Sequence, residues 1–232
     1  MTALLDVGVL HARDVAGAQG GGADRLWLAT ESGLSPDLQV VSSVLKETDL
    51  PVRVTLRLND SRTTTGGEFT RLVGLAEEYV ALGAEGVAFG FLDPDLEIDE
   101  DTCLALAGKL DGVPWTFPSL VDDCLEPARA WRRLRTFPGL DAVCSAGSPR
   151  GLGVGYDDLL ALAQSDSEIA ARLLPGEGLV AEQVPWLVRA GVRQFHVDTQ
   201  VRPGGSSKAY VDAGLVRSWR LLLGDMPVRD RA

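Results

Sequence analysis

The chain has 232 residues, of which 45% are hydrophobic, and a formal net charge of −11 at pH 7. This hydrophobic content excludes a disordered chain, and the acidic charge argues against nucleic acid or an anionic membrane surface as a partner. No apolar run approaches the roughly 20 residues of a membrane-spanning helix. The first residues, MTALLDVGVL, lack a signal-peptide pattern, and the three cysteines form no C-x-x-C pair. We therefore expect a cytoplasmic protein with free thiols.

Short apolar runs alternate with longer helical patterns along the whole chain. The predicted strands are residues 4–9, 25–29, 52–58, 86–91, 113–117, 142–145, 171–174 and 194–198. The predicted helices follow them near residues 11–20, 37–47, 67–82, 99–110, 125–135, 154–166, 181–190 and 209–223. Strict alternation of strands and helices requires parallel strands joined by right-handed crossovers. The pattern predicts an α/β fold with a single domain over residues 1–232, a (βα)8 TIM barrel, and an open doubly wound sheet is the alternative.

The joints that lead from helix to strand support this interpretation. Strands two, four, six and eight each follow a glycine, namely Gly22, Gly83, Gly139 and Gly191. Glycine ends a helix in the left-handed conformation at no steric cost. Strands three and five instead follow Pro51 and Pro114, because proline stops a helix and biases its predecessor toward extended geometry. The spacing of these joints favours a repeating barrel.

Polar side chains fall on strand positions that would face the barrel interior. In VRVTLRL, alternation places Arg53, Thr55 and Arg57 on one face. Arg57 is nearest the C-terminal end of the strand, and barrels carry their sites at that end. Arg57 is therefore a candidate ligand-binding residue at the mouth.

The last strand, QFHVDT, places His196 and Asp198 on one face. A carboxylate can orient an imidazole and raise its pKa, so these two residues are the candidates for acid–base catalysis. Strand one contributes Asp6 and strand two Arg25 to the same interior. Either these charged groups neutralise one another as a structural cluster, or they bind a small anionic ligand.

Two glycine-bearing loops offer a second candidate site for an anion. The loop after strand seven contains Gly176 and Gly178, and RPGGSSKAY follows strand eight at residues 202–210. Glycines there let backbone N–H groups approach an oxyanion. Glu177 would repel such an ion, and ordinary loop chemistry is the alternative.

Several segments together have the order and spacing of a known family. They are GGADRLWL, an L-R-L-N segment, GAEGVAFGFLDPDLEID, PWTFPSLVD, CSAG, LPGEG and QFHVD. The chain resembles the CutC family over roughly residues 4–199. The resemblance implies a cytosolic (βα)8 barrel connected with copper homeostasis and copper binding. The site positions that it implies are Arg25, Arg57, Asp122, Gly176, Gly178 and His196, with Asp6 where the family usually has Glu.

The chain departs from the family pattern at the expected mouth. Trp27 stands where the family has Glu, and Ala29 stands where a cysteine often occurs. Pro118 and Ser119 replace a His-Arg pair, and Glu177 replaces a glycine. These changes indicate a diverged member with a remodelled mouth.

The expected copper role depends on soft ligands, since copper(I) prefers thiolate, thioether and imidazole groups. With the family cysteine absent, the weak metal candidates are Cys124, in the loop after strand five, and Cys144, near the end of strand six. Copper as a cofactor is implied only by the resemblance.

Three functions stay open from the sequence. One is a copper-handling protein, whose partner is the copper ion. Another is an enzyme acting on a small anionic carboxylate or phosphate, with His196 as acid–base group and Arg25 and Arg57 on the anion. The third is a non-catalytic remnant of such an enzyme. A homo-oligomer is also left open.

Overall fold

The computed structural model describes residues 3–224, and in this part of the chain eight parallel strands form one sheet. Their order is β7-β6-β5-β4-β3-β2-β1-β8. The strands are β1 (Leu4–Val9), β2 (Arg25–Leu28), β3 (Val52–Thr55), β4 (Gly86–Ala88), β5 (Trp115–Phe117), β6 (Leu140–Ser145), β7 (Leu173–Pro175) and β8 (Gln194–Val197). β7 and β8 also pack together, so the sheet is a nearly closed barrel. The TIM-barrel prediction is confirmed, and the open sheet is excluded.

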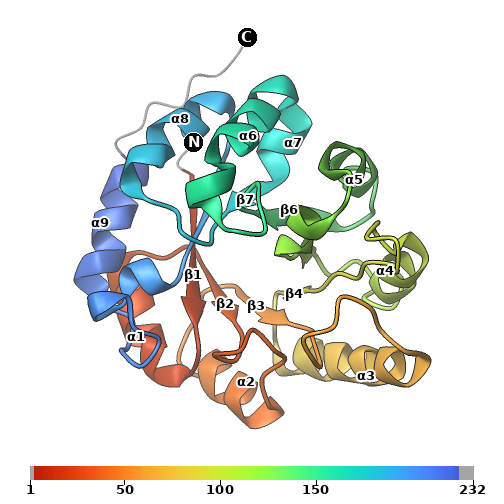
Figure 1. The fold of residues 1–232 in the computed structure, drawn as a ribbon. Helices are drawn as coiled ribbons and strands as arrows, with labels where there is room; N and C mark the ends of the chain where they lie inside the picture. Colours follow the sequence, from red (N-terminus) through yellow and green to blue (C-terminus); the bar gives the residue numbers. More distant parts are fainter. Residues whose placement is uncertain (1–2, 225–232) are drawn as a thin grey trace.

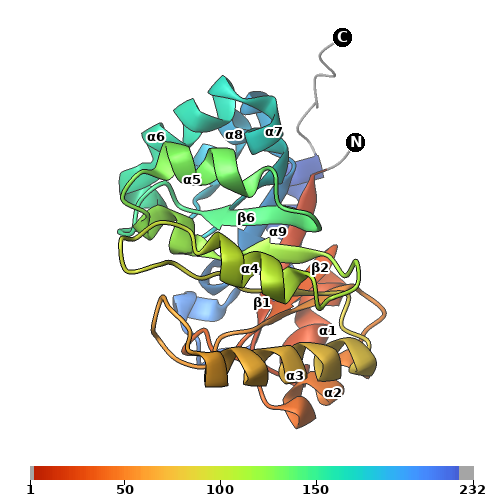
Figure 2. The same ribbon diagram turned by 90° about the vertical axis from the view of Figure 1, so that its right-hand side faces the viewer.

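Helices lie outside the strands and follow each of them (Figures 1 and 2). They are α1 (Ala12–Gly21), α2 (Leu38–Leu45), α3 (Gly66–Leu82), α4 (Glu100–Ala107), α5 (Pro127–Leu134), α6 (Leu152–Ser165), α7 (Ser167–Arg172), α8 (Val184–Ala190) and α9 (Ala213–Gly224). Short 3-10 turns occur at η1 (Ser119–Asp123), η2 (Ala181–Gln183), η3 (Thr199–Val201) and η4 (Pro203–Gly205). Among the helices of residues 3–224, none is both long and apolar enough to span a bilayer.

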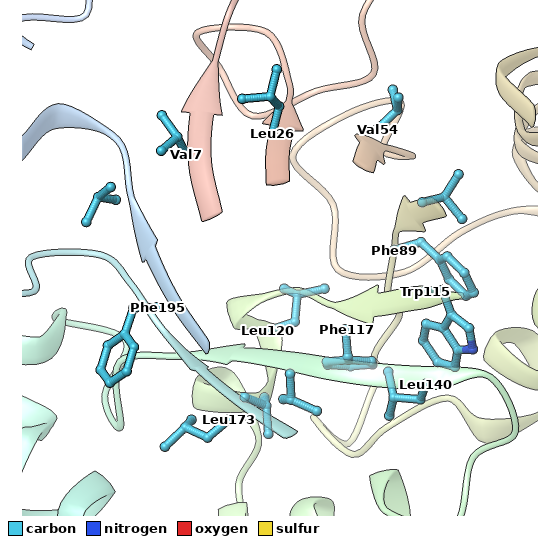
Figure 3. Close-up of a cluster of buried hydrophobic side chains, with 14 of the residues drawn as sticks. Val7, Leu26, Val54, Phe89, Trp115, Phe117, Leu120, Leu140, Leu173 and Phe195 are labelled. Atoms are coloured by element: carbon cyan, nitrogen blue, oxygen red, sulfur yellow. The ribbon is translucent and has the colours of Figure 1, made fainter. Parts of the chain in front are cut away.

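The hydrophobic core lies between the outer face of the barrel and the helices. Figure 3 shows side chains of this layer, among them Val7, Leu26, Val54 and Phe195, and all four are fully buried. The indole of Trp115 stacks on Phe89, with ring centroids 4.3 Å apart. Because alternate strand residues supply this layer, the other set points into the barrel, where the polar side chains lie.

The glycine joints at Gly22, Gly83 and Gly191 end helices as the sequence predicts, whereas α5 already ends at Leu134 with Arg135 as its cap, before Gly139. Gly22 ends α1 with φ 94° and Gly83 ends α3 with φ 107°, both in the left-handed region. In each case the backbone N–H groups at the joint donate to carbonyls of the last helical turn, and the next strand begins within three residues.

The bounds of several predicted elements differ from the structure. β3 and β4 end at Thr55 and Ala88, three residues earlier than expected, although Leu56 N and Phe89 N still donate to the neighbouring strands. The extra helix α7 was not expected and takes the first residues of the predicted seventh strand. It forms because the Asp166 carboxylate accepts hydrogen bonds from Glu168 N and Ile169 N at its start. α9 begins late because Asp212 accepts from Leu215 N.

Candidate functional site

The structure brings Asp6, Arg25 and His196 together inside the barrel. Strand register places Arg25 of β2 and His196 of β8 on either side of Asp6 in β1. The Arg25 Nε–H donates to Asp6 Oδ2, and His196 Nδ1 lies 2.6 Å from Asp6 Oδ1. Asp6 is fully buried, whereas the His196 side chain is 16% exposed. One carboxylate therefore joins two basic groups from neighbouring strands.

Asp6 is ionised at neutral pH. Burial raises its pKa, but the charge of Arg25 and the hydrogen bond from His196 outweigh burial and hold the pKa at about 2. An ionised carboxylate only accepts hydrogen bonds, so Nδ1 of His196 carries a hydrogen. In the neutral imidazole, Nε2 is then the nitrogen that can accept a proton. Arg25 Nη2 is buried and has no hydrogen-bond partner among the described residues.

Asp198 does not orient His196, which corrects the expected pairing. Its Oδ1 accepts a hydrogen bond from Arg202 Nε at 3.1 Å. Alternation stops because β8 ends at Val197 and the backbone of Asp198 turns into η3, with φ −134° and ψ −82°. Arg202 is fully buried and also donates to both carboxylate oxygens of Asp14 and to the carbonyl of Gly8. Asp198 thus belongs to an ion cluster that holds the loop after β8.

Trp27 divides the mouth of the barrel. Its Nε1–H donates to Thr55 Oγ1 at 2.8 Å, and its ring lies edge-on to His196, with centroids 5.1 Å apart. On one side is a cavity of about 280 Å³, here called the imidazole cavity. On the other side is a cavity of about 210 Å³, here called the Arg57 cavity. Trp27, Pro118 and Ser119 line both.

The imidazole cavity contains the predicted catalytic residues and one predicted thiol. Its polar lining is formed by Ser119, Cys144, Glu177, His196, Asp198, Thr199 and Gln200. Gly178 lines it as well, whereas Gly176 packs between His196 and Cys144. A Cβ at Gly176 would lie 3.3 Å from His196 Cδ2 and 3.6 Å from Cys144 Sγ. The short loop after β7 therefore closes directly onto the imidazole.

Glu177 is an exposed residue with positive φ, 38°, on that loop. Non-glycine residues rarely adopt this conformation, and they tend to gather at functional sites. Gly204 and Gly205 of the expected partner loop lie in η4 and line neither of these two cavities, whereas Ser207 of that loop lines a third cavity with His196 and Asp198. The glycines of the two loops therefore do not line one cavity, and an anion site there stays a prediction.

Arg57 lines the other cavity and Arg25 lines neither, so the structure does not bring the two arginines of the expected clamp to one cavity. Arg57 follows the end of β3, and its Nε and Nη2 donate to the carbonyls of Asn59 and Asp60 at 2.9 and 3.1 Å. Trp27 stands between Arg57 and His196. Arg53, four residues earlier on the same face, is buried toward the N-terminal ends of the strands and pairs with Asp141 and Glu85.

Asp122 lines neither mouth cavity. Its carboxylate accepts hydrogen bonds from Ser145 Oγ at 2.5 Å and from Ala146 N at 2.7 Å. Burial raises the pKa of Asp122 and the charge of Glu177 adds to the rise, while these hydrogen bonds oppose it. Asp122 therefore fixes the turn after β6, and a direct ligand-binding role stays a prediction.

The two candidate metal thiols are not brought together. Cys144 lines the imidazole cavity, whereas Cys124 lines a separate small hollow, and its thiol contacts the carbonyl of Leu120. Burial raises the pKa of Cys124 to about 12 and, together with Asp122 and Glu177, also raises that of Cys144. Within residues 3–224, no group of three or more His, Cys, Asp and Glu side chains could hold a metal ion. These donors do not fit a resident copper site.

Comparison with known proteins decides the family. The model of the CutC family matches residues 3–201. The chain belongs to the CutC family. A family protein named CutC from Klebsiella pneumoniae is 27% identical over 212 residues, covering 85% of this chain and 84% of the relative. The human protein named "Copper homeostasis protein cutC homolog" is 27% identical over 205 residues, covering 83% of this chain and 72% of the relative.

Solved structures agree on the fold. A crystal structure of CutC from Streptococcus agalactiae has a TM-score of 0.74 at 19% identity, covering 84% of this chain and 98% of that chain. The structure of KGPDC from Streptococcus mutans has a TM-score of 0.67 at 15% identity, covering 97% of this chain and 99% of that chain. At these identities the likeness shows the barrel alone.

Proposed function

We propose that this protein takes part in copper homeostasis in the cytoplasm. The observation that supports this is its place in the CutC family over residues 3–201, whose human and mouse members are named copper homeostasis proteins. The described residues form no group of three or more metal ligands, so the soft ligands available to copper as cargo are Cys144 and His196 in the imidazole cavity. The role in copper homeostasis then depends on weak or indirect contact with the metal.

A cellular experiment tests the homeostasis role. The gene is deleted in the organism that encodes this chain, and growth and copper content are measured over a series of copper concentrations. We expect the deletion to change copper tolerance and the wild-type gene to restore it. Unchanged growth and copper content at every concentration would contradict the proposal.

A binding experiment tests direct contact with copper. Purified protein competes with a copper(I) chelator, and Cys144→Ser and Cys124→Ser are matched thiol variants. We expect weak binding that Cys144→Ser removes and Cys124→Ser leaves unchanged, because only Cys144 faces the same cavity as His196. If both variants bind copper(I) as tightly as the wild type, neither thiol serves as a ligand.

A second candidate function is an acid–base enzyme acting on a small molecule in the imidazole cavity. The observation that favours it is the Asp6–His196 pair, because a carboxylate on Nδ1 fixes the tautomer that leaves Nε2 available for proton transfer. Arg25 pairs with the same carboxylate from the other side and lowers its pKa, so Asp6 stays ionised and keeps the imidazole oriented. A thermal-shift screen of small carboxylates and phosphates tests it, with His196→Asn as the control. A ligand that stabilises the wild type more than His196→Asn supports this function, and the absence of any such ligand would contradict it.

A further inference from the structure

The Arg57 cavity lies on the far side of Trp27 from His196 and has no part in the functions proposed above. Its floor and walls are mostly apolar, and the side chains that form them are Leu56, Leu58, Leu72, Phe89, Phe91 and the indole of Trp27. Leu56, Leu72 and Phe89 are almost completely buried. Hydroxyl groups of Ser61, Thr63 and Thr64 stand among the remaining lining residues. The cavity therefore offers an apolar interior with polar groups on the loop that follows β3.

The volume of this cavity limits the size of a ligand. It measures about 210 Å³. An apolar cavity of about 150 Å³ is large enough to bind benzene. The Arg57 cavity can therefore hold one six-membered ring, or a branched chain of similar size, together with one small polar group.

Charge limits the chemistry of that polar group. Among the described lining residues only Arg57 and Glu68 are charged. Arg57 holds its guanidinium in place by donating to the carbonyls of Asn59 and Asp60, and its Nη1 makes no hydrogen bond to a described residue. An arginine fixed in this way presents a free N–H edge suited to a carboxylate.

Glu68 does not compete for that edge. Its Oε1 accepts from Asn59 Nδ2 at 2.5 Å, and its Oε2 accepts from Thr65 N at 2.8 Å and Thr65 Oγ1 at 3.0 Å. These bonds close the capping box at the start of α3, and the hydrogen bonds from Thr65 lower the pKa of Glu68. The carboxylate is thus committed to the helix terminus, and Arg57 is left as the one cation that can meet a ligand within this lining.

We propose that the Arg57 cavity binds a small apolar carboxylic acid, with its ring or branched chain against Trp27 and Phe91 and its carboxylate on Arg57. A phosphate ester suits the site less well, because a doubly charged group needs several donors and this lining supplies one arginine. A neutral ring would leave the guanidinium edge without a partner. The site is separate from the imidazole cavity, so it does not depend on either function proposed for that cavity.

Isothermal titration calorimetry with benzoate as the probe tests this proposal. Benzamide keeps the ring and loses the charge, whereas acetate keeps the charge and loses the ring. We expect benzoate to bind on the order of tenfold more tightly than either, since each lacks one half of the recognition. Equal affinity of benzoate and benzamide would overturn the role of the arginine, and equal affinity of benzoate and acetate would overturn the apolar interior. These comparisons use the wild-type protein and do not depend on how a variant folds.

Matched arginine variants locate the site. Arg57→Gln should weaken benzoate binding on the order of tenfold, and Arg57→Lys should weaken it less, because a charge remains without the planar edge. Arg62→Gln is the control, since Arg62 is an exposed arginine nearby that pairs with Asp123 and does not line the cavity. His196→Gln should leave benzoate binding unchanged. Loss with His196→Gln but not with Arg57→Gln would place benzoate in the imidazole cavity and overturn the proposal.

Discussion

His196 Nδ1 lies 2.6 Å from Oδ1 of Asp6, a residue of the first strand. Asp198, the near neighbour of His196 in the sequence, instead accepts a hydrogen bond from Arg202. The pairing of His196 with Asp6 ties the last strand of the barrel to the first, and the Arg25 guanidinium on β2 completes it from the other side. The imidazole is thus held by the fold itself and not by the loop that follows it.

Removing the charge of Asp6 should cost considerable stability. In Asp6→Asn the buried guanidinium of Arg25 loses its ionic partner, and breaking a buried pair in this way costs about 3 kcal/mol or more. Urea denaturation measures the change in the free energy of unfolding. The double variant Asp6→Asn with Arg25→Met should lose less than Asp6→Asn alone, because no charge is then left unpaired. A double variant that is less stable than the single one would contradict this explanation.

Acid should weaken the native protein through the same carboxylate. The pKa of Asp6 is about 2 in the fold against an ordinary value of 3.8, so the unfolded chain binds the proton more tightly. The stabilisation is fully present above about pH 5 and is lost as the pH falls toward 2, and it amounts to about 2 kcal/mol. Unfolding free energies measured from pH 6 to pH 2 should fall more steeply for the wild type than for Asp6→Asn. Parallel curves would show that Asp6 does not contribute.

The bond between Trp27 and Thr55 should be measurable as a coupling. Trp27→Phe and Thr55→Val each remove one partner of the hydrogen bond at 2.8 Å, and a double-mutant cycle isolates the pair. We expect a coupling free energy of about 1 kcal/mol. Trp219, which lies on α9 away from the mouth, supplies a matched control as Trp219→Phe. A coupling near zero would mean that the indole position does not depend on Thr55.

Arg202 should control the loop after β8. Arg202→Met leaves the carboxylates of Asp14 and Asp198 without their buried cation, so we expect a loss of about 3 kcal/mol in stability. Hydrogen exchange followed by mass spectrometry should show faster exchange over residues 198–212 than over β3. Arg220→Met is the control, because Arg220 pairs with Asp24 at the other end of the barrel and is partly exposed. Uniform acceleration across all peptides would indicate global unfolding instead.

Thiol labelling should distinguish the three cysteines. Cys144 is partly exposed, whereas Cys103 and Cys124 are buried, so iodoacetamide should label Cys144 first. Its raised pKa leaves little thiolate at neutral pH, and labelling should therefore be slow at pH 7.5 and should accelerate as the pH rises. Peptide mapping measures the order. Labelling of Cys124 before Cys144 would contradict the placement of the two thiols.

Much of the barrel follows from patterns that are local in the sequence. The bounds of β1 agree with the prediction to the residue, because LLDVGV is an apolar run between clear breaks. α3 agrees within one residue, since Thr65 and Glu68 form a capping box and Gly83 ends it. The alternating direction of side chains along β1, β2 and β8 also predicts that Asp6, Arg25 and His196 point together into the barrel.

The parts that sequence reasoning missed depend on where the strands stop. Side-chain alternation places Arg57 and Asp198 at the mouth, where both line cavities, but β3 ends at Thr55 and β8 at Val197, so alternation does not predict their hydrogen-bond partners. The partner of Asp198, Arg202, sits in a glycine-rich loop where no periodic pattern marks a buried charge. The partition of the mouth by Trp27 likewise needed the contact with Thr55, which joins different strands.

The junction between β7 and β8, where the strands pack together without backbone pairing, has a consequence for the imidazole cavity. In the described residues no ladder pairing joins these strands, and the Gln194 side chain instead donates to the carbonyls of Asp141 and Ala171. A small separation of the two strands would therefore break side-chain contacts and leave every backbone ladder intact. Glu177, Gly178 and His196 line the imidazole cavity at this seam, so a separation of β7 from β8 would widen that cavity and admit a larger ligand.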